Sequence, residues 1–445
     1  MMNRRTFFSA TAGTAAMVSL TGSGEGNSVK SGESPNSGNV LAGMTFKELR
    51  KRYHSVLFDE YLPFMDKHII DHENGGFMCN ASPDGALITT SKRAVYEGRG
   101  IWVYSFLYNN CARKQKYLDV ARKSAEFLLK NKPDGDSMWP ESFDKEGNPN
   151  APPGTSVNAD LYIADGFAEY AKAAGDLKYH DLAKEITLKC LRVYDRPDYN
   201  PAAGRGYVGS DAPLIPGIRI MDDWMLFLRA ATRMLEQKPD KDMEILAGRC
   251  VDTIMNKYYN PKFDLVTEIL NHDHSFPDNE YGQVVNFGND FQALWHIMAE
   301  AVRIRNKSLF DTAAARLKHH IEVARDDVYG GVFTVLAHVD KNRWHLGKAH
   351  YSQVETLVGL MMIIEHTGDD WAYDLFTEIH GYVEEKFLLK QYGYPLWILG
   401  SDRKVTFDKN SSRIGNFHQP RHLLLNLTAL DRIIERKGRV SGVFG

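Results

Sequence analysis

The 445-residue sequence has few cysteines and no clustered ones. Its four cysteines form no C-x-x-C pair, so we expect packed thiols and neither a metal site nor a disulfide framework. No long uncharged apolar run occurs, and a formal net charge of -3 offers no basic surplus for nucleic acid or for an anionic membrane. The absence of a glycine-rich phosphate loop and of a G-x-S-x-G elbow favours chemistry without a nucleotide.

The N-terminus resembles a twin-arginine export signal. Arg4-Arg5-Thr6-Phe7-Phe8 precedes a weakly apolar run from Ala10 to Leu20, although a simple basic tail is the alternative. We predict an export signal over residues 1–24, which would carry the folded protein to the periplasm. A disordered linker rich in Gly, Ser and Asn is predicted over residues 25–43.

Helical patterns fill the chain from Thr45 onward. Apolar residues recur at helical spacing in segments that come in pairs, joined by short turns such as Gly175-Asp176. Connections between the pairs carry hairpin signals such as Asn74-Gly75-Gly76. The predicted helices cover residues 46–70, 94–110, 115–131, 158–174, 179–195, 218–236, 243–258, 289–306, 309–325, 350–367, 370–388 and 418–436. The sequence therefore predicts an all-α protein of about twelve helices with short β-hairpins.

The first helices of successive pairs begin about 60 to 70 residues apart, which is typical of one repeated supersecondary unit. Six such hairpins close into an (α/α)6 barrel in which one helix of each pair lies inside. A helical solenoid is the alternative, but hairpins confined to one side of every pair favour the closed barrel. The polar residues at the starts of the inner helices would then meet at one mouth.

The last of these helix starts carries the strongest chemical signal. It reads Gly415-Asn416-Phe417-His418-Gln419-Pro420-Arg421, with a proline in the first turn and two basic side chains at a helix N-terminus. His418 is the best candidate for a general base, because an imidazole titrates near neutral pH. Arg99, with Trp102 on the same helix face, suits sugar oxygens or a developing enediolate charge. A packed histidine and a surface ion pair are the structural alternatives.

Carboxylates lie near several other inner helix starts. Glu355 and Gln353 come early in the fifth inner helix, where Glu355 would bind sugar hydroxyls or orient His418, or only stabilise the helix dipole. Capping explains Asp160 and Asp290 well, whereas the adjacent Asp222 and Asp223 also match the two carboxylates that glycoside hydrolysis needs. Asn271-His272-Asp273-His274 has no third ligand at a familiar spacing, so we predict no metal site.

Several short motifs recur together along the chain. They are Glu73-Asn74-Gly75-Gly76-Phe77 with Asp84-Gly85, Glu97-Gly98-Arg99, Ala159-Asp160, Val284-Val285-Asn286-Phe287-Gly288-Asn289-Asp290 with Trp295, Gln353-Val354-Glu355 and Phe417-His418-Gln419-Pro420-Arg421. In this order and spacing, residues 46–435 resemble the N-acylglucosamine 2-epimerase superfamily, which includes cellobiose 2-epimerases and mannose-type isomerases. The resemblance implies an (α/α)6 barrel that removes the proton α to the carbonyl of an open-chain sugar without a cofactor.

The resemblance also implies roles for single residues. Arg99 would stabilise the enediolate, His418 would act as one acid/base, and Glu355 would bind or orient. The family's Gly-His-x-x-Glu motif reads Gly288-Asn289-Asp290-Phe291-Gln292 here, and neither Asn289 nor Gln292 takes a proton at neutral pH. A second base would have to be Asp290, Asp222 or Asp223 with a pKa raised by burial.

Three functions stay open at this point: a sugar 2-epimerase or aldose–ketose isomerase, which we favour; a glycoside hydrolase, including one acting on unsaturated uronides; and a non-catalytic sugar-binding relative. We predict one barrel domain over residues 44–437, a flexible tail over 438–445, a small carbohydrate as partner, neither nucleic acid nor membrane as partner, no cofactor, and an interface that allows a homodimer. The predicted catalytic residues are His418, Arg99, Glu355 and Asp290, and the predicted substrate-binding residues are Asn289, Gln292, Gln353, Trp102, Asp160, Tyr162, Asp222, Asp223 and Arg421.

Overall fold

The computed structural model divides the chain into two units, Met1–Ser37 and Gly38–Gly445. The structure describes residues 40–201, 208, 216–395, 398–399 and 413–445. The predicted export signal and most of the predicted linker therefore lie outside the described residues. Everything below concerns the second unit.

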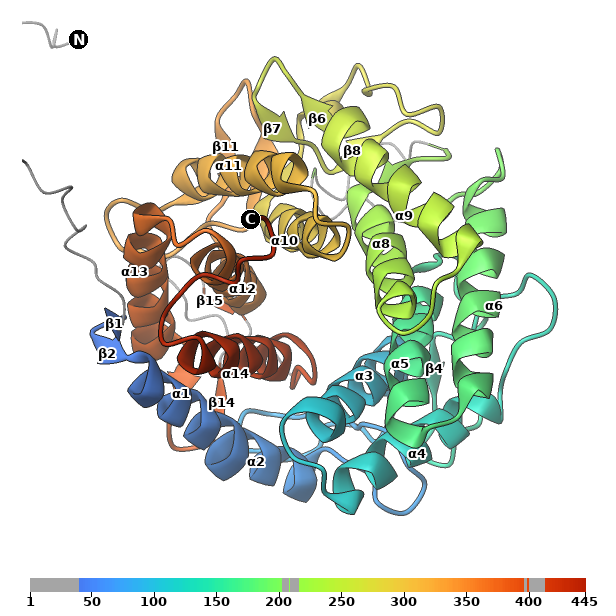
Figure 1. Ribbon diagram of the computed structural model, residues 1–445. Helices are drawn as coiled ribbons and strands as arrows, with labels where there is room; N and C mark the ends of the chain where they lie inside the picture. The colour runs from blue at the N-terminus through green and yellow to red at the C-terminus, as the bar shows by residue number, and fades with distance from the viewer. Residues whose placement is uncertain (1–39, 202–207, 209–215, 396–397, 400–412) are drawn as a thin grey trace, which may run out of the picture. The chain divides into compact units, whose positions relative to one another are not determined.

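Six inner helices form a closed ring in this unit (Figure 1). They are α3 (Ala94–Asn110), α5 (Asn158–Ala174), α8 (Met221–Leu235), α10 (Phe287–Arg303), α12 (His350–His366) and α14 (His418–Glu435). Each contacts the next, and α14 returns to α3, so α14 and α8 occupy opposite sides of the ring. This arrangement confirms the predicted barrel.

An outer layer of helices surrounds the ring. It comprises α4 (Gln115–Leu129), α6 (Leu177–Tyr194), α9 (Lys241–Asp252) continued by η2 (Thr253–Lys257), α11 (Lys307–Ala324), α13 (Asp370–Lys386), and the span α1 (Phe46–Ser55), η1 (Val56–Tyr61) and α2 (Leu62–His68). A capping box between Thr45 and Glu48 starts α1, which packs on α14. The sixth helix pair is therefore made from the two ends of the described chain.

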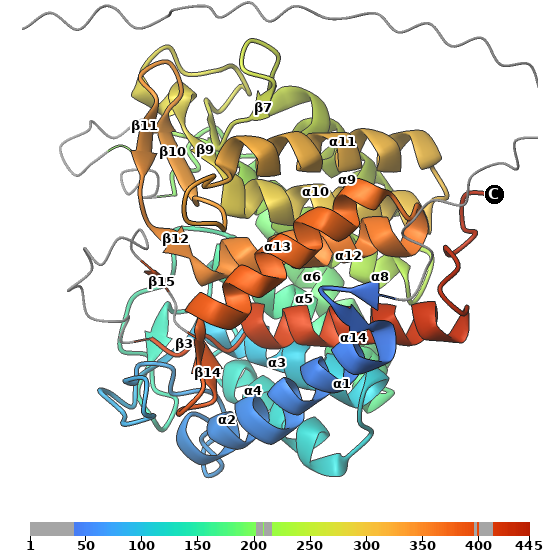
Figure 2. The same cartoon turned by 90° about the vertical axis from the view of Figure 1, so that its left-hand side faces the viewer.

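Short antiparallel strand pairs lie where inner helices begin, and of these only β10 and β11 form a hairpin in the described residues. β3 (Lys92–Arg93) pairs with β4 (Ser142–Phe143), β5 (Arg219–Ile220) with β8 (Ile269–Leu270), β12 (Lys348–Ala349) with β15 (Ile398–Leu399), and β10 (Val335–His338) lies between β9 (Val285–Asn286) and β11 (Arg343–His345). Because β3, β5, β9 and β12 end where α3, α8, α10 and α12 start, these strands hold four helix N-termini at one mouth. Figure 2 shows β3, β9, β10, β11, β12 and β15 at the same end of the barrel.

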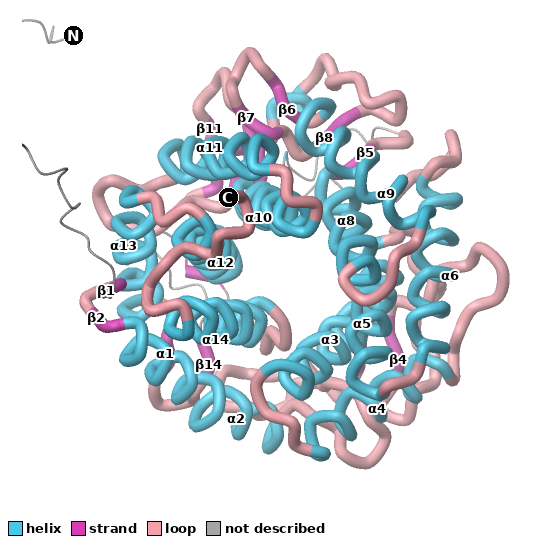
Figure 3. The backbone as a smooth tube through the Cα atoms, viewed as in Figure 1, coloured by secondary structure: helices cyan, strands magenta, loops and turns pink. Residues whose placement is uncertain are grey.

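The remaining strands also pair locally, β1 (Val40–Leu41) with β2 (Met44–Thr45), β6 (Tyr259–Asn260) with β7 (Leu265–Val266) and β13 (Leu388–Leu389) with β14 (Tyr394–Pro395). A single 3-10 turn, η3 (Glu280–Gln283), precedes β9. The tube in Figure 3 makes the proportion plain: helices form the body, and the strands are short pieces of the connections.

Apolar packing between the two layers forms the core. Inner helices such as α3 and α12 are buried around most of their circumference, whereas α4 buries one face only. Helices α3 and α5 approach closely because Gly98 has no side chain: a Cβ there would lie 2.6 Å from the backbone nitrogen of Ile163. This close contact places the residue after Gly98, Arg99, beside α5.

The cysteines and the C-terminal segment bear on two further predictions. The four cysteines are free, as predicted, and three of them are buried. The flexible tail predicted for residues 438–445 is wrong, because Phe444 packs 5.1 Å from the Phe310 ring and Ser441 Oγ lies 2.7 Å from Nδ1 of His366. The apolar ring of Phe444 packs on Phe310 and His366, and this contact holds the segment against the helices. Among the described residues, no helix is long and apolar enough to span a bilayer.

Candidate active site

His418, the first residue of α14, is bound to a buried carboxylate from α12. Its Nδ1 lies 2.8 Å from Oε1 of Glu355. The other oxygen of Glu355 accepts a hydrogen bond of 3.0 Å from Nε1 of Trp295 on α10, and Arg421 also pairs with Oε1. Three inner helices therefore meet at the carboxylate of Glu355.

The surrounding charges fix the protonation of this pair. Burial opposes ionisation of Glu355, but Arg421 and His418 outweigh it and lower the pKa of Glu355 to about 2. Burial lowers the pKa of His418 to about 3 against the attraction of Glu355, and Arg421 and Arg99 lower it further. At neutral pH the imidazole is therefore neutral. Since Glu355 is an acceptor only, Nδ1 donates to it, and Nε2 is the basic nitrogen.

Three arginines surround the ring of Phe417, the residue before His418. The guanidinium carbons of Arg99, Arg229 and Arg421 lie 5.3, 4.6 and 4.3 Å from the ring centroid. Arg229 pairs with Asp165, and Arg421 pairs with Glu355. Arg99 also stacks on the Tyr162 ring at 4.2 Å, as its register beside α5 requires.

Arg99 differs from the other two arginines because it forms no ion pair with a described residue, although it attracts the ionised form of Asp222. Its buried Nε has no hydrogen-bond partner, and within the described residues it makes no ion pair. Its side chain is half-buried. A cation held by aromatic stacking and lacking an acceptor is available to a negatively charged oxygen of a ligand.

Asp222 and Asp223 open α8 but face different surroundings. Asp222 is half-buried, and its Oδ2 accepts a 2.8 Å hydrogen bond from Nδ2 of Asn158. Burial raises the pKa of Asp222, although Arg99 attracts the ionised form. Asp223 is only 3% exposed and faces the hydroxyl of Tyr199 at 3.5 Å; burial and the charge of Asp222 raise its pKa to about 8.

The start of α10 carries the altered motif. Asn289 Nδ2 donates to Oε1 of Glu268 at 2.9 Å, and Oε1 of Gln292 accepts from Arg421 at 2.6 Å. Gln292 therefore joins the Glu355 cluster. Asp290 is fully buried, neither of its oxygens is hydrogen-bonded, and burial together with Glu268 raises its pKa well above the usual range.

Three predicted substrate-binding residues make contacts that hold the fold. The side-chain amide of Gln353 bonds both backbone groups of Val332, at 2.9 and 2.7 Å. Asp160 pairs with Lys189 at 2.6 Å, and Trp102 is 1% exposed. The structure thus brings together His418, Glu355, Arg421, Gln292, Arg99 and Tyr162, with Asp222 and Asn289 at neighbouring helix starts. Gln353, Asp160, Asp223 and Asp290 are buried, as is Trp102, whose ring lies 5.8 Å from that of Phe417.

The N-acylglucosamine 2-epimerase family model matches residues 60–415 of the sequence. The chain belongs to this family. An N-acylglucosamine 2-epimerase of Mus musculus is 24% identical over 418 residues, which cover 88% of this chain and 94% of the relative. Membership confirms the resemblance, and the chain is an enzyme of the sugar 2-epimerase or isomerase class.

Solved structures of the same fold cover most of the chain. The cellobiose 2-epimerase from Bacillus thermoamylovorans B4167 is 17% identical, with a TM-score of 0.72 over 86% of this chain and 99% of that chain. A D-mannose isomerase is 13% identical, with a TM-score of 0.71 over 86% of this chain and 97% of that chain. At these identities the likeness establishes the (α/α)6 barrel alone.

Buried lysines fix the two helix starts that carry Arg99 and Glu355. The Nζ of Lys92 lies 2.8 Å from Asp71 and donates to the carbonyl of Gly75 at 2.6 Å, just before α3. The Nζ of Lys348 lies 2.7 Å from Asp326 and donates to the carbonyl of Gly330 at 2.7 Å, just before α12. Both lysines are fully buried. Each joins the end of the preceding outer helix to the start of an inner one.

Four residues near the site were missed by the sequence reasoning: Asn158, Arg229, Glu268 and Tyr351. The ring of Tyr351 lies 5.2 Å from that of His418, and its hydroxyl donates to Oδ1 of Asn286 at 3.2 Å. Asn158 and Tyr351 stand in the first turn of predicted helices, so the helix-start rule applied to every polar residue would have found them. Arg229 and Glu268 carry no such signal.

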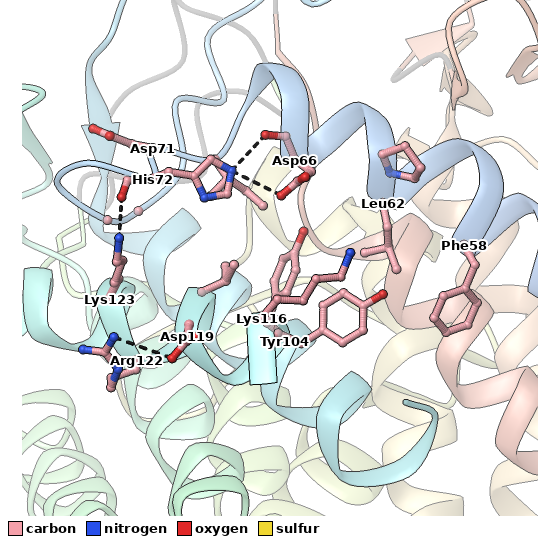
Figure 4. A pocket seen from close by; sticks show the side chains of 16 residues that line it. Phe58, Leu62, Asp66, Asp71, His72, Tyr104, Lys116, Asp119, Arg122 and Lys123 are labelled. Atoms are coloured by element: carbon pink, nitrogen blue, oxygen red, sulfur yellow. Dashed lines mark hydrogen bonds and ion pairs between the residues drawn. The ribbon is translucent and has the colours of Figure 1, made fainter. Parts of the chain in front are cut away.

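Several cavities lie outside the mouth. One, of about 420 Å³, lies between α2 and α4; Figure 4 shows Asp66, His72, Lys116 and Tyr104 around it. Another, of about 310 Å³, lies among the C-terminal halves of inner helices and reaches the ring of Trp295. Among the described residues no group of three or more His, Cys, Asp or Glu side chains is placed to hold a metal ion, His272 and His274 included.

Proposed function

We propose that this family member moves the proton on C2 of an open-chain aldose or N-acylhexosamine, without a cofactor, and so forms the 2-epimer or the ketose. The observation that carries the proposal is a neutral imidazole that is fixed by an ionised carboxylate and lies near an arginine without an ion pair in the described part of the chain. His418, Glu355 and Arg99 supply these three parts. The family and its relatives, named as epimerases of N-acylglucosamine and of cellobiose, support the same class.

The chemistry follows from these groups. Nε2 of His418 takes the C2 proton, and the electron pair of that C–H bond moves through C1 to the carbonyl oxygen, which becomes an enediolate oxygen. Arg99 stabilises the negative charge, and Glu355 stabilises the imidazolium that forms. Returning a proton to C2 on the other face gives the epimer. For an aldose, returning it to C1 gives the ketose, because the C2 hydroxyl passes its proton to the C1 oxygen and becomes the carbonyl. General acid–base catalysis of this kind contributes about 10²- to 10⁴-fold.

The carboxylates argue against the hydrolase alternative. Asp160 and Asp165 on α5 are the other two carboxylates considered for hydrolysis, and they are paired with Lys189 and Arg229, respectively. Asp223 is buried, so Asp222 is the one member of these candidates that stays partly exposed. Glycoside hydrolysis needs two carboxyl groups facing the same bond. We also propose periplasmic export through the twin-arginine-like segment and allow for a homodimer; both rest on the sequence.

The test is proton NMR in D2O with free aldoses, N-acetylhexosamines and β-linked disaccharides. The wild-type protein should place deuterium at C2 of at least one sugar and form its epimer or ketose. In the epimer whose C2 proton faces His418, His418→Asn should lower this exchange at least about 100-fold, because the amide takes no proton. The matched control is His319→Asn, which changes a half-buried histidine on α11 and should leave exchange unaltered.

Added imidazole should partly restore exchange in His418→Ala, which separates loss of a base from loss of the fold. No exchange by the wild-type protein on any sugar of the panel, or undiminished exchange of both epimers of a converted pair by His418→Asn, would overturn the proposal. Release of a new reducing end from the disaccharides would favour the hydrolase instead.

A further inference from the structure

Inversion of the configuration at C2 of the sugar requires a proton-transfer group on each face. A group fixed on one side of the sugar removes a proton from one face and cannot return it to the other. His418 stands on one side of the mouth, and the position of a second proton carrier is held by Asn289, whose amide takes no proton. The inference below rests on the proposed function and concerns which residue serves the second face.

Among the residues that the structure describes, four carboxylates lie near this part of the mouth, and three of them are buried from solvent. Glu268 and Asp290 are 0% exposed, and Asp223 is nearly so while facing Tyr199. Asp222 alone is half-buried. Its Oδ2 is held by Asn158, which orients the carboxyl group and leaves Oδ1 to meet a ligand.

The position of Asp222 in the ring is the second argument. Asp222 lies in the first turn of α8, and His418 is the first residue of α14, on opposite sides of the six-helix ring (Figure 1). Both helices begin at the same mouth, so a sugar bound there has one of these groups on each side. Arg99, on α3 between them, attracts the ionised form of Asp222 more strongly than Arg229 or Arg421 does.

We propose that Asp222 is the second proton-transfer group and serves the face of C2 opposite His418. In one direction Nε2 of His418 takes the C2 proton, and the electron pair moves to the carbonyl oxygen. The carboxylic acid of Asp222 then donates its proton to the other face of C2 while the carbonyl forms again. The enzyme is left with an imidazolium and a carboxylate, and proton exchange with water restores the starting state. The reverse reaction uses the two groups in exchanged roles.

The test uses Asp222→Asn, which keeps the size of the side chain and an oxygen for Asn158. Each epimer of a converted pair is incubated separately in D2O, and both C2 exchange in the recovered sugar and conversion are measured. Asp222→Asn should lose conversion at least about 100-fold but keep C2 exchange, within a few-fold, in the one epimer whose C2 proton faces His418. Asp181→Asn, at an exposed carboxylate on α6, is the control for conversion and exchange.

His418→Asn should show the mirror result and exchange only the other epimer. Thermal unfolding of each variant establishes that the fold is kept. The assignment would be overturned if Asp222→Asn still converted one epimer into the other, or if it lost C2 exchange of both epimers equally. A ketose formed at an unchanged rate by Asp222→Asn would also overturn it, while leaving proton transfer by His418 intact. Absence of exchange by the wild-type protein is the separate failure of the proposed function.

Discussion

Two connections of the barrel, far apart in the sequence, are built in the same way. In the first turn, residues 69–78, Asp71 Oδ1 accepts from the backbone nitrogens of residues 73 and 74. In the second turn, residues 324–333, Asp326 does the same for residues 328 and 329. Both turns contain two consecutive glycines with positive φ, residues 75–76 and 330–331. Both aspartates bind a buried lysine, Lys92 or Lys348.

The register after the lysine is also shared. Five residues beyond Lys92, Oε1 of Glu97 accepts from the nitrogen of Phe77 at 3.0 Å; five residues beyond Lys348, Oε1 of Gln353 accepts from that of Val332 at 2.9 Å. Two residues further on come Arg99 and Glu355. One backbone arrangement therefore presents a cation from α3 and an anion from α12 at the same mouth.

The largest expected effect tests the difference between Glu355, which is ion-paired, and Arg99, which forms no ion pair with a described residue. Glu355→Gln removes the counter-charge of Arg421 and the acceptor that fixes His418, so activity should fall at least about 100-fold. The loss of a buried ion pair should also lower the free energy of unfolding by about 3 to 5 kcal/mol. Initial rates and urea unfolding at pH 7 measure both effects.

Arg99→Met is the matched change at the equivalent position. Because Arg99 has no ion pair among the described residues, this variant should lose about 100-fold in activity while its stability changes by less than about 1 kcal/mol. Equal stability losses in the two variants would contradict the asymmetry described here.

Much of the fold was readable because the repeat unit is long and regular. The predicted helices 94–110 and 158–174 match α3 and α5, and most other boundaries fall within about three residues. Larger differences occur where α9 passes into η2, since a π-type turn continues the apolar spacing beyond the α-helix. The packed C-terminus was missed because only the closed barrel offers Phe444 a surface.

The site was readable where residues share a helix start, and less so where contacts cross the barrel. His418, Arg99 and Glu355 were selected from helix starts and from the family resemblance, and their roles stay predictions. Gln353 looked like a ligand contact because no pattern in the sequence reports that both ends of its amide bind Val332. Neither Lys92 nor Lys348 carries a signal by itself. When the starts of α3 and α12 are aligned, the two lysines fall at the same position.

The next effect in size should be equal in the two turns. Lys92→Met and Lys348→Met each leave a buried aspartate without its cation, so each should lower the free energy of unfolding by about 3 to 5 kcal/mol. Urea unfolding followed by circular dichroism measures this. The exposed pair of Lys307 with Asp311 offers a control, since Lys307→Met should cost under about 1 kcal/mol. A large loss in one turn only would show that the two are not equivalent.

The smallest effect isolates the residue at which the two turns differ. Burial raises the pKa of Glu97 to about 7, against the hydrogen bonds of Ser124 and Phe77. Between pH 4.5 and 7 the carboxyl group of Glu97 loses its proton in the unfolded chain but largely keeps it in the folded protein. The free energy of unfolding therefore falls by about 2 to 3 kcal/mol across that window because of Glu97. Glu97→Gln should remove that loss, because an amide does not titrate.

Gln353→Glu is the reciprocal change. The new carboxyl group would face both backbone groups of Val332, and only its protonated form can donate to the carbonyl that Gln353 now binds at 2.7 Å. This variant should therefore acquire the decline in stability between pH 4.5 and 7 that Glu97→Gln loses. Urea unfolding of both variants and the wild type at several pH values measures the differences, in which all other titrating groups cancel. Parallel curves for the three proteins would show that the carboxyl group of Glu97 ionises as freely in the barrel as in the unfolded chain.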